Sequence, residues 1–166
     1  MGNLVQNKSF VVSFAIGIII LLLLPENRIE AREKEIIQRE LVSELVPKPA
    51  KYDILLPPSY DPNSTAPLPL LIWLHGGSNG KDHLKKRLEE HIRSAWSNGI
   101  LSPLVVVAPI TGNSYYIDWK DGSQQWEKFL TSEFLVEVRQ QFNVRKDPAG
   151  TVIAGASAGG QGTLRI

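Results

Sequence analysis

The feature that most constrains the fold of this chain is the pentapeptide Gly155-Ala156-Ser157-Ala158-Gly159, which directly follows the apolar run 151–154. A strand that passes into a helix through so short a turn needs small residues, because the two backbones approach each other closely. Such a turn presents its central side chain, here the Ser157 hydroxyl, at the top of the sheet, where the strand ends. The pattern therefore predicts a buried strand, a sharp turn and a helix.

Two more apolar runs, residues 70–74 and 104–108, are predicted to be strands buried on both faces. The segment 81–98 between them has one apolar stripe and is followed by Gly99, which predicts a helix and its end. A second helix is expected after the polar, aromatic loop 111–123. It carries apolar residues spaced by four: Trp126, Leu130, Phe134, Val138 and Phe142. Strands that alternate with helices are typical of an α/β fold with a parallel sheet.

The segment 32–50 is open to two interpretations. Its residues Ile37, Leu41 and Leu45 lie four apart, which suits one face of a helix. The prolines that follow form a turn before the strand-like residues 52–56, and two runs around such a turn equally fit a β-hairpin. The local pattern leaves both possibilities open.

Composition excludes several classes of protein. The chain has 166 residues, enough for one domain with a sizeable core, and its net charge of +1 gives no reason to expect a nucleic acid as partner. There is no cysteine, so disulfides, thiolate catalysis and cysteine metal sites are excluded. His, Asp and Glu show no ligand spacing, and we expect neither a metal nor a cofactor.

The amino terminus carries an apolar run at residues 10–24, followed by Pro25 and charged residues. Its fifteen residues fit the core of a secretory signal, and Ala31 offers a small residue before a cleavage site. An uncleaved membrane anchor is the alternative. We therefore expect residues 1–31 to be a signal peptide or anchor, and the protein to be periplasmic, extracellular or anchored. This segment is the only membrane contact predicted.

Ser157 is the candidate nucleophile, although a serine in such a turn can also serve only to fit the turn. As a nucleophile it needs a base to take its proton and backbone N–H donors for the oxyanion that forms. One donor is expected to be Ala158, the residue after the serine. The other is expected in the glycine loop that follows the strand 70–74, with Gly77 as first choice and Gly76 as second.

The histidines are given lesser roles. His75 stands in the glycine loop and is expected to shape it, while His83 and His91 are expected to be solvated on the helix 81–98. The aromatic loop follows the carboxyl end of a strand, where α/β proteins bind ligands. Trp119 and Tyr116 are therefore candidate substrate-binding residues, and a packed surface loop is the equal alternative.

Together these motifs resemble the esterase D-like group of α/β-hydrolases, which includes S-formylglutathione hydrolases, feruloyl and acetylxylan esterases and antigen 85-type mycolyltransferases. The resemblance spans residues 36 to 166. Its matching pieces are residues 52–61, 74–77, 118–119, 126–133 and 155–164. It implies an α/β-hydrolase fold, with a mostly parallel sheet and flanking helices, that opens with a hairpin. It also implies Ser157 as nucleophile and Ala158 and Gly77 as oxyanion donors.

In that group the acid and the histidine of the catalytic triad come after the position of Ile166. The resemblance therefore implies that residues 32–166 are the N-terminal portion of a hydrolase domain, truncated after the turn that carries Ser157. The expected function is a serine carboxylic-ester hydrolase that forms an acyl-enzyme on a small-molecule or carbohydrate-linked ester. An acyltransferase on the same site and a non-catalytic truncated product are the alternatives. The chain alone is expected to be inactive and poorly soluble.

Overall fold

The computed structural model describes residues 35–77 and 79–166. The signal peptide or anchor predicted at residues 1–31 lies outside these residues. Among the helices that are described, none combines the length and the apolar character that a membrane span requires.

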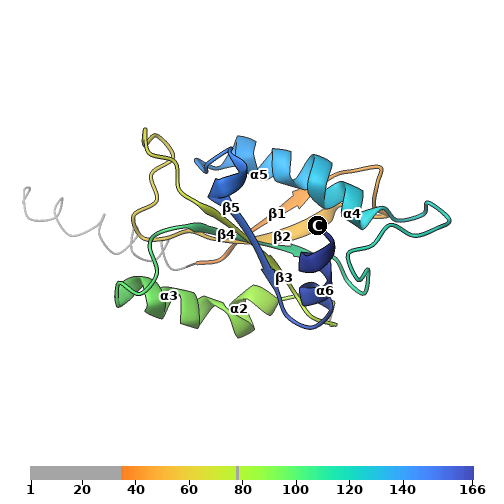
Figure 1. Cartoon of the computed structure of the whole chain (residues 1–166), viewed down its shortest axis with the longest axis horizontal. Coiled ribbons are helices and arrows are strands. Elements are labelled where there is room, and N and C mark those ends of the chain that lie inside the picture. The colour runs from red at the N-terminus through yellow and green to blue at the C-terminus, as the bar shows by residue number, and fades with distance from the viewer. Residues whose placement is uncertain (1–34, 78) are drawn as a thin grey trace, which may run out of the picture. The chain divides into compact units, whose positions relative to one another are not determined.

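Five strands form one sheet in the order β1-β2-β4-β3-β5 (Figure 1). Strand β4 pairs in parallel with β3, which pairs in parallel with β5, and these are the three strands predicted from apolar runs. Strand β2 pairs antiparallel with β4 on one side and with β1 on the other, so the sheet is mixed. The bounds are Ile37–Leu41 for β1, Ala50–Leu55 for β2, Leu70–Leu74 for β3, Val105–Ile110 for β4 and Thr151–Gly155 for β5.

The segment 32–50, for which the sequence left a helix and a β-hairpin open, contributes to the antiparallel pair β1 and β2. Ile37 pairs with Ile54 and Leu41 with Ala50. A spacing of four residues is an even number, so Ile37 and Leu41 share one face of a strand as well as one face of a helix. Both pack against the larger core cluster, and the long-range pairing with β2 decides in favour of the strand.

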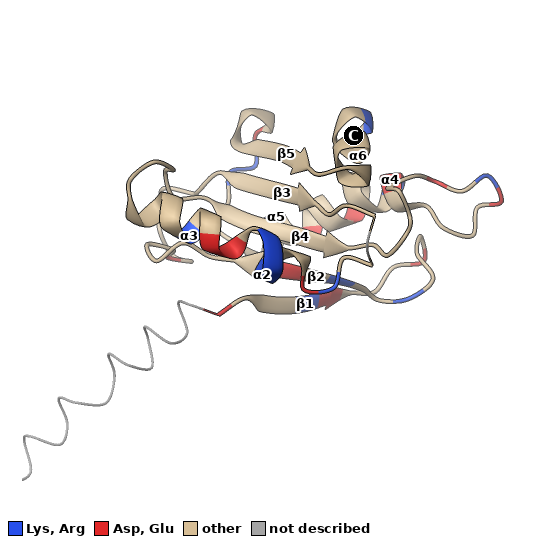
Figure 2. Cartoon of the chain, turned by 90° about the horizontal axis from the view of Figure 1, so that it is seen from below, with Lys and Arg blue, Asp and Glu red and all other residues tan. Residues whose placement is uncertain are grey.

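One face of the sheet is covered by helices α2 (His83–Arg87) and α3 (Glu89–Ser97) (Figure 2). They pack on a small cluster that includes Leu84, which is fully buried. The single helix predicted over 81–98 is interrupted at Leu88, whose φ of −127° lies outside the helical range. Gly99 follows with φ +66°, the left-handed conformation expected of a residue that ends a helix.

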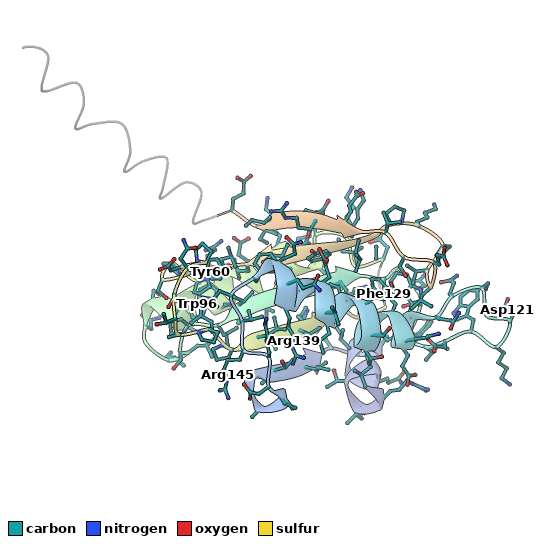
Figure 3. The ribbon with its side chains drawn as sticks, turned by 90° about the horizontal axis from the view of Figure 1, so that it is seen from above. Tyr60, Trp96, Asp121, Phe129, Arg139 and Arg145 are labelled. Atoms are coloured by element: carbon teal, nitrogen blue, oxygen red, sulfur yellow. The ribbon has the colours of Figure 1, made fainter. Side chains whose placement is uncertain are left out.

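The other face is covered by α4 (Trp126–Lys128), a π-helical segment η1 (Phe129–Phe134) and α5 (Leu135–Gln141) (Figure 3). The sequence predicts one continuous helix here, and the structure inserts wider turns. These turns place Phe129 and Phe134, five residues apart, in the same core, where both are almost fully buried.

A short 3-10 turn, η2 (Pro148–Gly150), leads into β5, and α6 (Ala158–Arg165) follows it. Helix α6 packs on β3 and β5. Within the described residues β5 is an edge of the sheet, and its Val152 is 57% exposed. Val152 is the exposed apolar side chain of this strand, whereas Ile153 packs against the larger core cluster.

Candidate active site

The turn between β5 and α6 has the sharp geometry that the pentapeptide predicts. Ser157 has φ 53° and ψ −116°, a backbone conformation that side-chain-bearing residues rarely adopt. Such a conformation costs on the order of 1–3 kcal/mol and persists only where the surrounding structure enforces it. The Ser157 side chain is exposed, so the strained turn presents its hydroxyl to solvent at the carboxyl end of β5.

The two glycines of the pentapeptide are required by close packing against β3. A Cβ atom on Gly159 would lie 2.0 Å from the carbonyl oxygen of Leu74, and one on Gly155 would lie 2.5 Å from the Gly159 carbonyl group. The Ala156 N–H donates a hydrogen bond to the same Leu74 oxygen over 3.2 Å. The end of β3 and the turn are thus held against each other, and only glycine fits between them.

This contact brings the glycine loop beside the candidate nucleophile. A Cβ on Gly76 would lie 3.6 Å from the Ser157 Cβ, whereas a Cβ on Gly77 would meet no atom within 4 Å. Within the described part of the chain, the backbone N–H groups of Gly76, Gly77 and Ala158 have no acceptor. Gly76 is thus the glycine that approaches Ser157, and Gly77 faces open space. The assignment of Gly77 and Ala158 as oxyanion donors stays a prediction.

His75 is buried, with 2% of its surface exposed, and both of its ring nitrogens have partners. The Thr111 N–H donates to Nε2 over 3.2 Å, so the proton lies on Nδ1, which donates to the Gly76 carbonyl over 2.7 Å. Burial lowers the pKa of this imidazole. A Cβ on Gly80, whose φ is +79°, would collide with the ring. His75 therefore supports the glycine loop as a neutral side chain, as the sequence predicts.

Tyr116 lies beneath the aromatic loop and not at its surface. Its side chain is 1% exposed, and its hydroxyl donates to the His75 carbonyl over 2.8 Å. A Cβ on Gly162 of α6 would lie 2.9 Å from the ring, and burial raises the pKa of the phenol. Sequence reasoning grouped Tyr116 with the substrate-binding residues. The structure gives it a supporting position, because the ring connects the glycine loop to the helix that follows Ser157.

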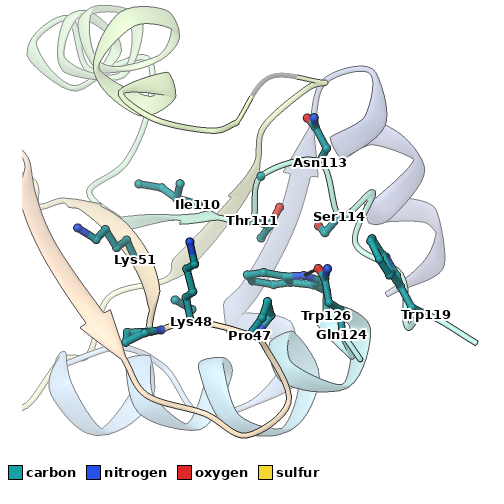
Figure 4. Close-up of a pocket in the computed structure, with 13 residues that line it drawn as sticks. Pro47, Lys48, Lys51, Ile110, Thr111, Asn113, Ser114, Trp119, Gln124 and Trp126 are labelled. Carbon is teal, nitrogen blue, oxygen red and sulfur yellow. Dashed lines mark hydrogen bonds between the residues drawn. The ribbon is translucent and has the colours of Figure 1, made fainter. Parts of the chain in front are cut away.

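Trp119, the other predicted substrate-binding residue, is 42% exposed. It lines a cavity of about 460 Å³ together with Trp126, Lys48 and Asn113 (Figure 4). The cavity opens at the end of β4, the edge of the sheet at which β5 delivers Ser157. This position agrees with a ligand-binding role for Trp119, which no contact in the structure tests.

The expectation for His83 is wrong. This side chain is half-buried, and its Nδ1 accepts a hydrogen bond from Trp73 Nε1 over 3.2 Å. Its ring lies 6.0 Å from that of His75, and its pKa is lowered by burial and, to a lesser extent, by Arg87. The alternation of side chains along β3 was the available signal, because it turns Trp73 toward α2. His91 is exposed, as expected.

The arrangement offers an exposed hydroxyl next to unpaired backbone N–H groups, which is the minimum that a serine nucleophile and an oxyanion need. It does not bring a base to the hydroxyl, since no hydrogen bond joins Ser157 to a histidine in the described residues. The same part of the chain contains no cluster of three side chains able to hold a metal.

Comparison with known families matches residues 43–166 to the one described as "Putative esterase". Among solved structures, a ferulic acid esterase is 24% identical, with a TM-score of 0.69, over 78% of this chain and 50% of that chain. FphF, a fluorophosphonate-binding serine hydrolase of Staphylococcus aureus, is 23% identical, with a TM-score of 0.65, over 79% of this chain and 50% of that chain. An S-formylglutathione hydrolase from Agrobacterium tumefaciens is 23% identical, with a TM-score of 0.60, over 76% and 50%. Comparison with curated proteins finds no similar sequence.

These likenesses confirm the predicted fold, an α/β-hydrolase sheet with flanking helices. The chain spans about half the length of these solved structures.

Proposed function

Because the chain belongs to this esterase family, we propose that it forms the nucleophile-bearing portion of a serine carboxylic-ester hydrolase. The observation that carries the proposal is the strained, exposed Ser157 beside the unpaired N–H groups of the glycine loop. A conformation this costly is retained where function requires it. The ester classes named for the similar structures, ferulic acid esters and S-formylglutathione, indicate the range of substrates to test.

The proposed reaction proceeds through an acyl-enzyme. Ser157 Oγ attacks the carbonyl carbon of the ester while a base removes the hydroxyl proton, and the carbonyl oxygen becomes an oxyanion. The bond from that carbon to the alcohol oxygen then breaks, and the alcohol leaves with the proton. Water attacks the Ser157 ester in the same way, releases the acid and restores the hydroxyl.

The part of this chemistry that the described residues supply is electrostatic. The N–H groups of Ala158 and of Gly77 or Gly76 would donate to the oxyanion. Removing one donor from such a site typically lowers kcat by about 10²–10³-fold. They are backbone groups fixed by β3, the turn and α6, so they need no reorganisation when charge develops. The base must come from residues other than the described histidines that are already engaged, His75 and His83.

The test uses protein expressed from the whole reading frame that contains these residues. We expect hydrolysis of p-nitrophenyl acetate and covalent labelling of Ser157 by a fluorophosphonate, located by mass spectrometry. Ser157→Ala is the matched variant and should lose both signals while it keeps its fold. Hydrolysis that survives this substitution, or a label on another residue, would refute the proposal.

We propose that the 166-residue chain by itself behaves differently, because no histidine among the described residues is hydrogen-bonded to Ser157. We expect hydrolysis of activated esters barely above background and no stable acyl-enzyme, since sites without a triad base keep only the catalysis of the oxyanion hole and binding. A robust burst of p-nitrophenol that depends on Ser157 would show instead that the chain has a complete site.

An acyltransferase would use the same site and differ only in the acceptor. Adding a competing alcohol and analysing the products separates the two reactions, because a transferase forms the new ester where a hydrolase forms the acid.

The export proposed from residues 10–24 is tested separately. The first residue of the mature protein is found by mass spectrometry on protein from an expressing cell. It should lie near residue 32 if the leader is removed.

A further inference from the structure

The cavity beside Trp119 is a built pocket of small-molecule size. Its volume of about 460 Å³ lies in the range of sites that enclose small ligands. It lies between residues 47–51, which lead into β2, residues 110–114, which end β4, and the two tryptophans Trp119 and Trp126. Because β2 runs antiparallel to β4, these segments meet at one edge of the sheet. We call it the tryptophan–lysine pocket, defined by Trp119, Trp126, Lys48 and Lys51.

In this pocket the Trp126 side chain and the backbone of Trp119 are held in place before any ligand binds. Trp126 is 7% exposed, and its Nε1 donates to Gln124 Oε1 over 2.8 Å. The Trp119 N–H donates to the Gln124 carbonyl over 2.7 Å, and the Gln125 N–H donates to the Leu45 carbonyl over 2.7 Å. A preformed wall loses little conformational entropy on binding, which favours a flat ring as ligand.

The loop that carries Trp119 is also hydrogen-bonded to α4, so its position does not depend on the contacts of the tryptophans alone. The Asp118 carboxylate accepts hydrogen bonds from the backbone N–H groups of Glu127 and Lys128, over 2.9 and 3.2 Å. These contacts join the loop to the first turn of α4. The Asp118 carboxylate is thus engaged outside the pocket and does not line it.

The charge of the pocket is positive. Two lysines line it, and no Asp or Glu is among its lining residues. Lys51 is paired with Glu40 over 3.1 Å, whereas Lys48 has no ion pair in the described part of the chain. Figure 4 shows the Lys48 side chain extending toward the end of β4 beside the Trp126 ring. A ligand with a carboxylate would therefore meet an ammonium group that forms no ion pair with any described residue.

The pocket is also placed within reach of the candidate nucleophile. Thr111, which lines it, donates its N–H to His75 Nε2, and the glycine after His75 approaches Ser157. Strands β4, β3 and β5 are neighbours, and strand spacing of about 4.8 Å puts the ends of β4 and β5 about 10 Å apart. One ligand of moderate length can occupy both places.

We infer that the tryptophan–lysine pocket binds a ring that bears a carboxylate and forms the part of the substrate remote from the reacting ester bond. Its assignment to a substrate rests on the proposed function, while the binding of a carboxylate-bearing ring does not. Contacts to such a remote part would help to hold the ester against Ser157. Trp119 would pack on the ring, and Lys48 would receive the carboxylate.

The test compares two probes of almost equal shape, benzoate and benzamide, which differ in charge. Each is titrated into ¹⁵N-labelled protein from the whole reading frame, and the indole N–H signals of Trp119 and Trp126 are followed. We expect saturable shifts with benzoate and binding of benzamide about ten-fold weaker, which corresponds to about 1.4 kcal/mol for one charged contact. Benzoate binding should also weaken as salt is added.

The matched variants are Lys48→Met and Lys120→Met. Lys120 lies in the same exposed loop as Trp119 but outside this pocket, so its loss should leave the preference for benzoate unchanged. Lys48→Met should make the affinities for benzoate and benzamide about equal. Equal binding of the two probes, or a preference that survives Lys48→Met, would overturn the assignment of the carboxylate. Absence of shifts at both tryptophans would overturn the pocket itself.

These outcomes are separable from the proposed function. If Ser157 fails to react with fluorophosphonate but benzoate binds through Lys48, the pocket stands and the esterase proposal falls. If Ser157 reacts and benzoate does not bind, the esterase proposal stands and this inference falls.

Discussion

Replacing Gly159 with alanine tests the claim that β3 and the turn at Ser157 are packed backbone against backbone. The new Cβ would lie 2.0 Å from the Leu74 carbonyl oxygen, 2.6 Å from its carbon and 2.7 Å from the His75 carbonyl oxygen. Real Cβ atoms keep at least 3.0 Å from such neighbours, so α6 and β3 must separate by about 1.0 Å. The obstructing atoms are main-chain atoms, which have no alternative rotamer.

The expected cost exceeds that of ordinary overpacking, which is about 1–3 kcal/mol. The separation also weakens the hydrogen bond from Ala156 to Leu74, worth about 1 kcal/mol. We therefore expect Gly159→Ala to lower the free energy of unfolding by at least about 3 kcal/mol, or the melting temperature by roughly 6–12 °C at about 2–4 °C per kcal/mol.

The matched control is Gly160→Ala, the same substitution one residue later in the same helix. Its Cβ would meet only the Gly155 carbonyl oxygen, at an ordinary 3.5 Å. Because alanine is the better helix former by about 1 kcal/mol, this variant should be as stable as the original or slightly more so. Urea unfolding followed by circular dichroism measures both. If Gly159→Ala unfolds at the same urea concentration as Gly160→Ala, the packing argument is wrong.

Three further predictions concern the same site. Ser157→Gly should be about 1 kcal/mol more stable than Ser157→Ala, because only glycine relieves the strained φ, and parallel thermal melts would compare them. Tyr116→Phe should cost about 1–2 kcal/mol in urea unfolding, because it leaves the His75 carbonyl unpaired; an unchanged midpoint would contradict this role. Burial lowers the pKa of His83, so the unfolded chain binds its proton more readily than the folded chain. That share of stability is complete above about pH 6.5 and is lost as pH falls through the lower folded-state pKa. His83→Gln should reduce the loss of stability between about pH 7.5 and 5.5, whereas His91→Gln should not.

Much of the fold could be predicted because its signals are local. Apolar runs predicted β3, β4 and β5, and small residues predicted the turn around Ser157. The position of the helix over 81–98 was predicted correctly. Its interruption at Leu88 was not predicted, because the interruption depends on how the chain packs against the sheet.

The candidate active site could likewise be predicted only in part. Ser157 and the glycine loop could be predicted because a tight turn and a close backbone approach restrict the residue types that fit. The role of Tyr116 could not be predicted, because its partner, His75, is 41 residues away. For His83, the alternation of side chains along β3 places Trp73 on the face toward α2, but the contact itself depends on how the helix packs. An aromatic or imidazole side chain fits a surface and an interior equally well, so its residue type does not specify its burial.

The sequence by itself determined the sharp turn at Ser157 and the three parallel strands, because each follows from steric limits or an apolar run within a short segment. The α/β-hydrolase fold was implied by the resemblance of its motifs to a known group. The tertiary structure decided that residues 37–41 form a strand, that Gly76 and not Gly77 approaches Ser157, and that Lys48 shares a cavity with two tryptophans. These outcomes depend on which distant segments meet, and long-range packing, not local preference, fixes that choice.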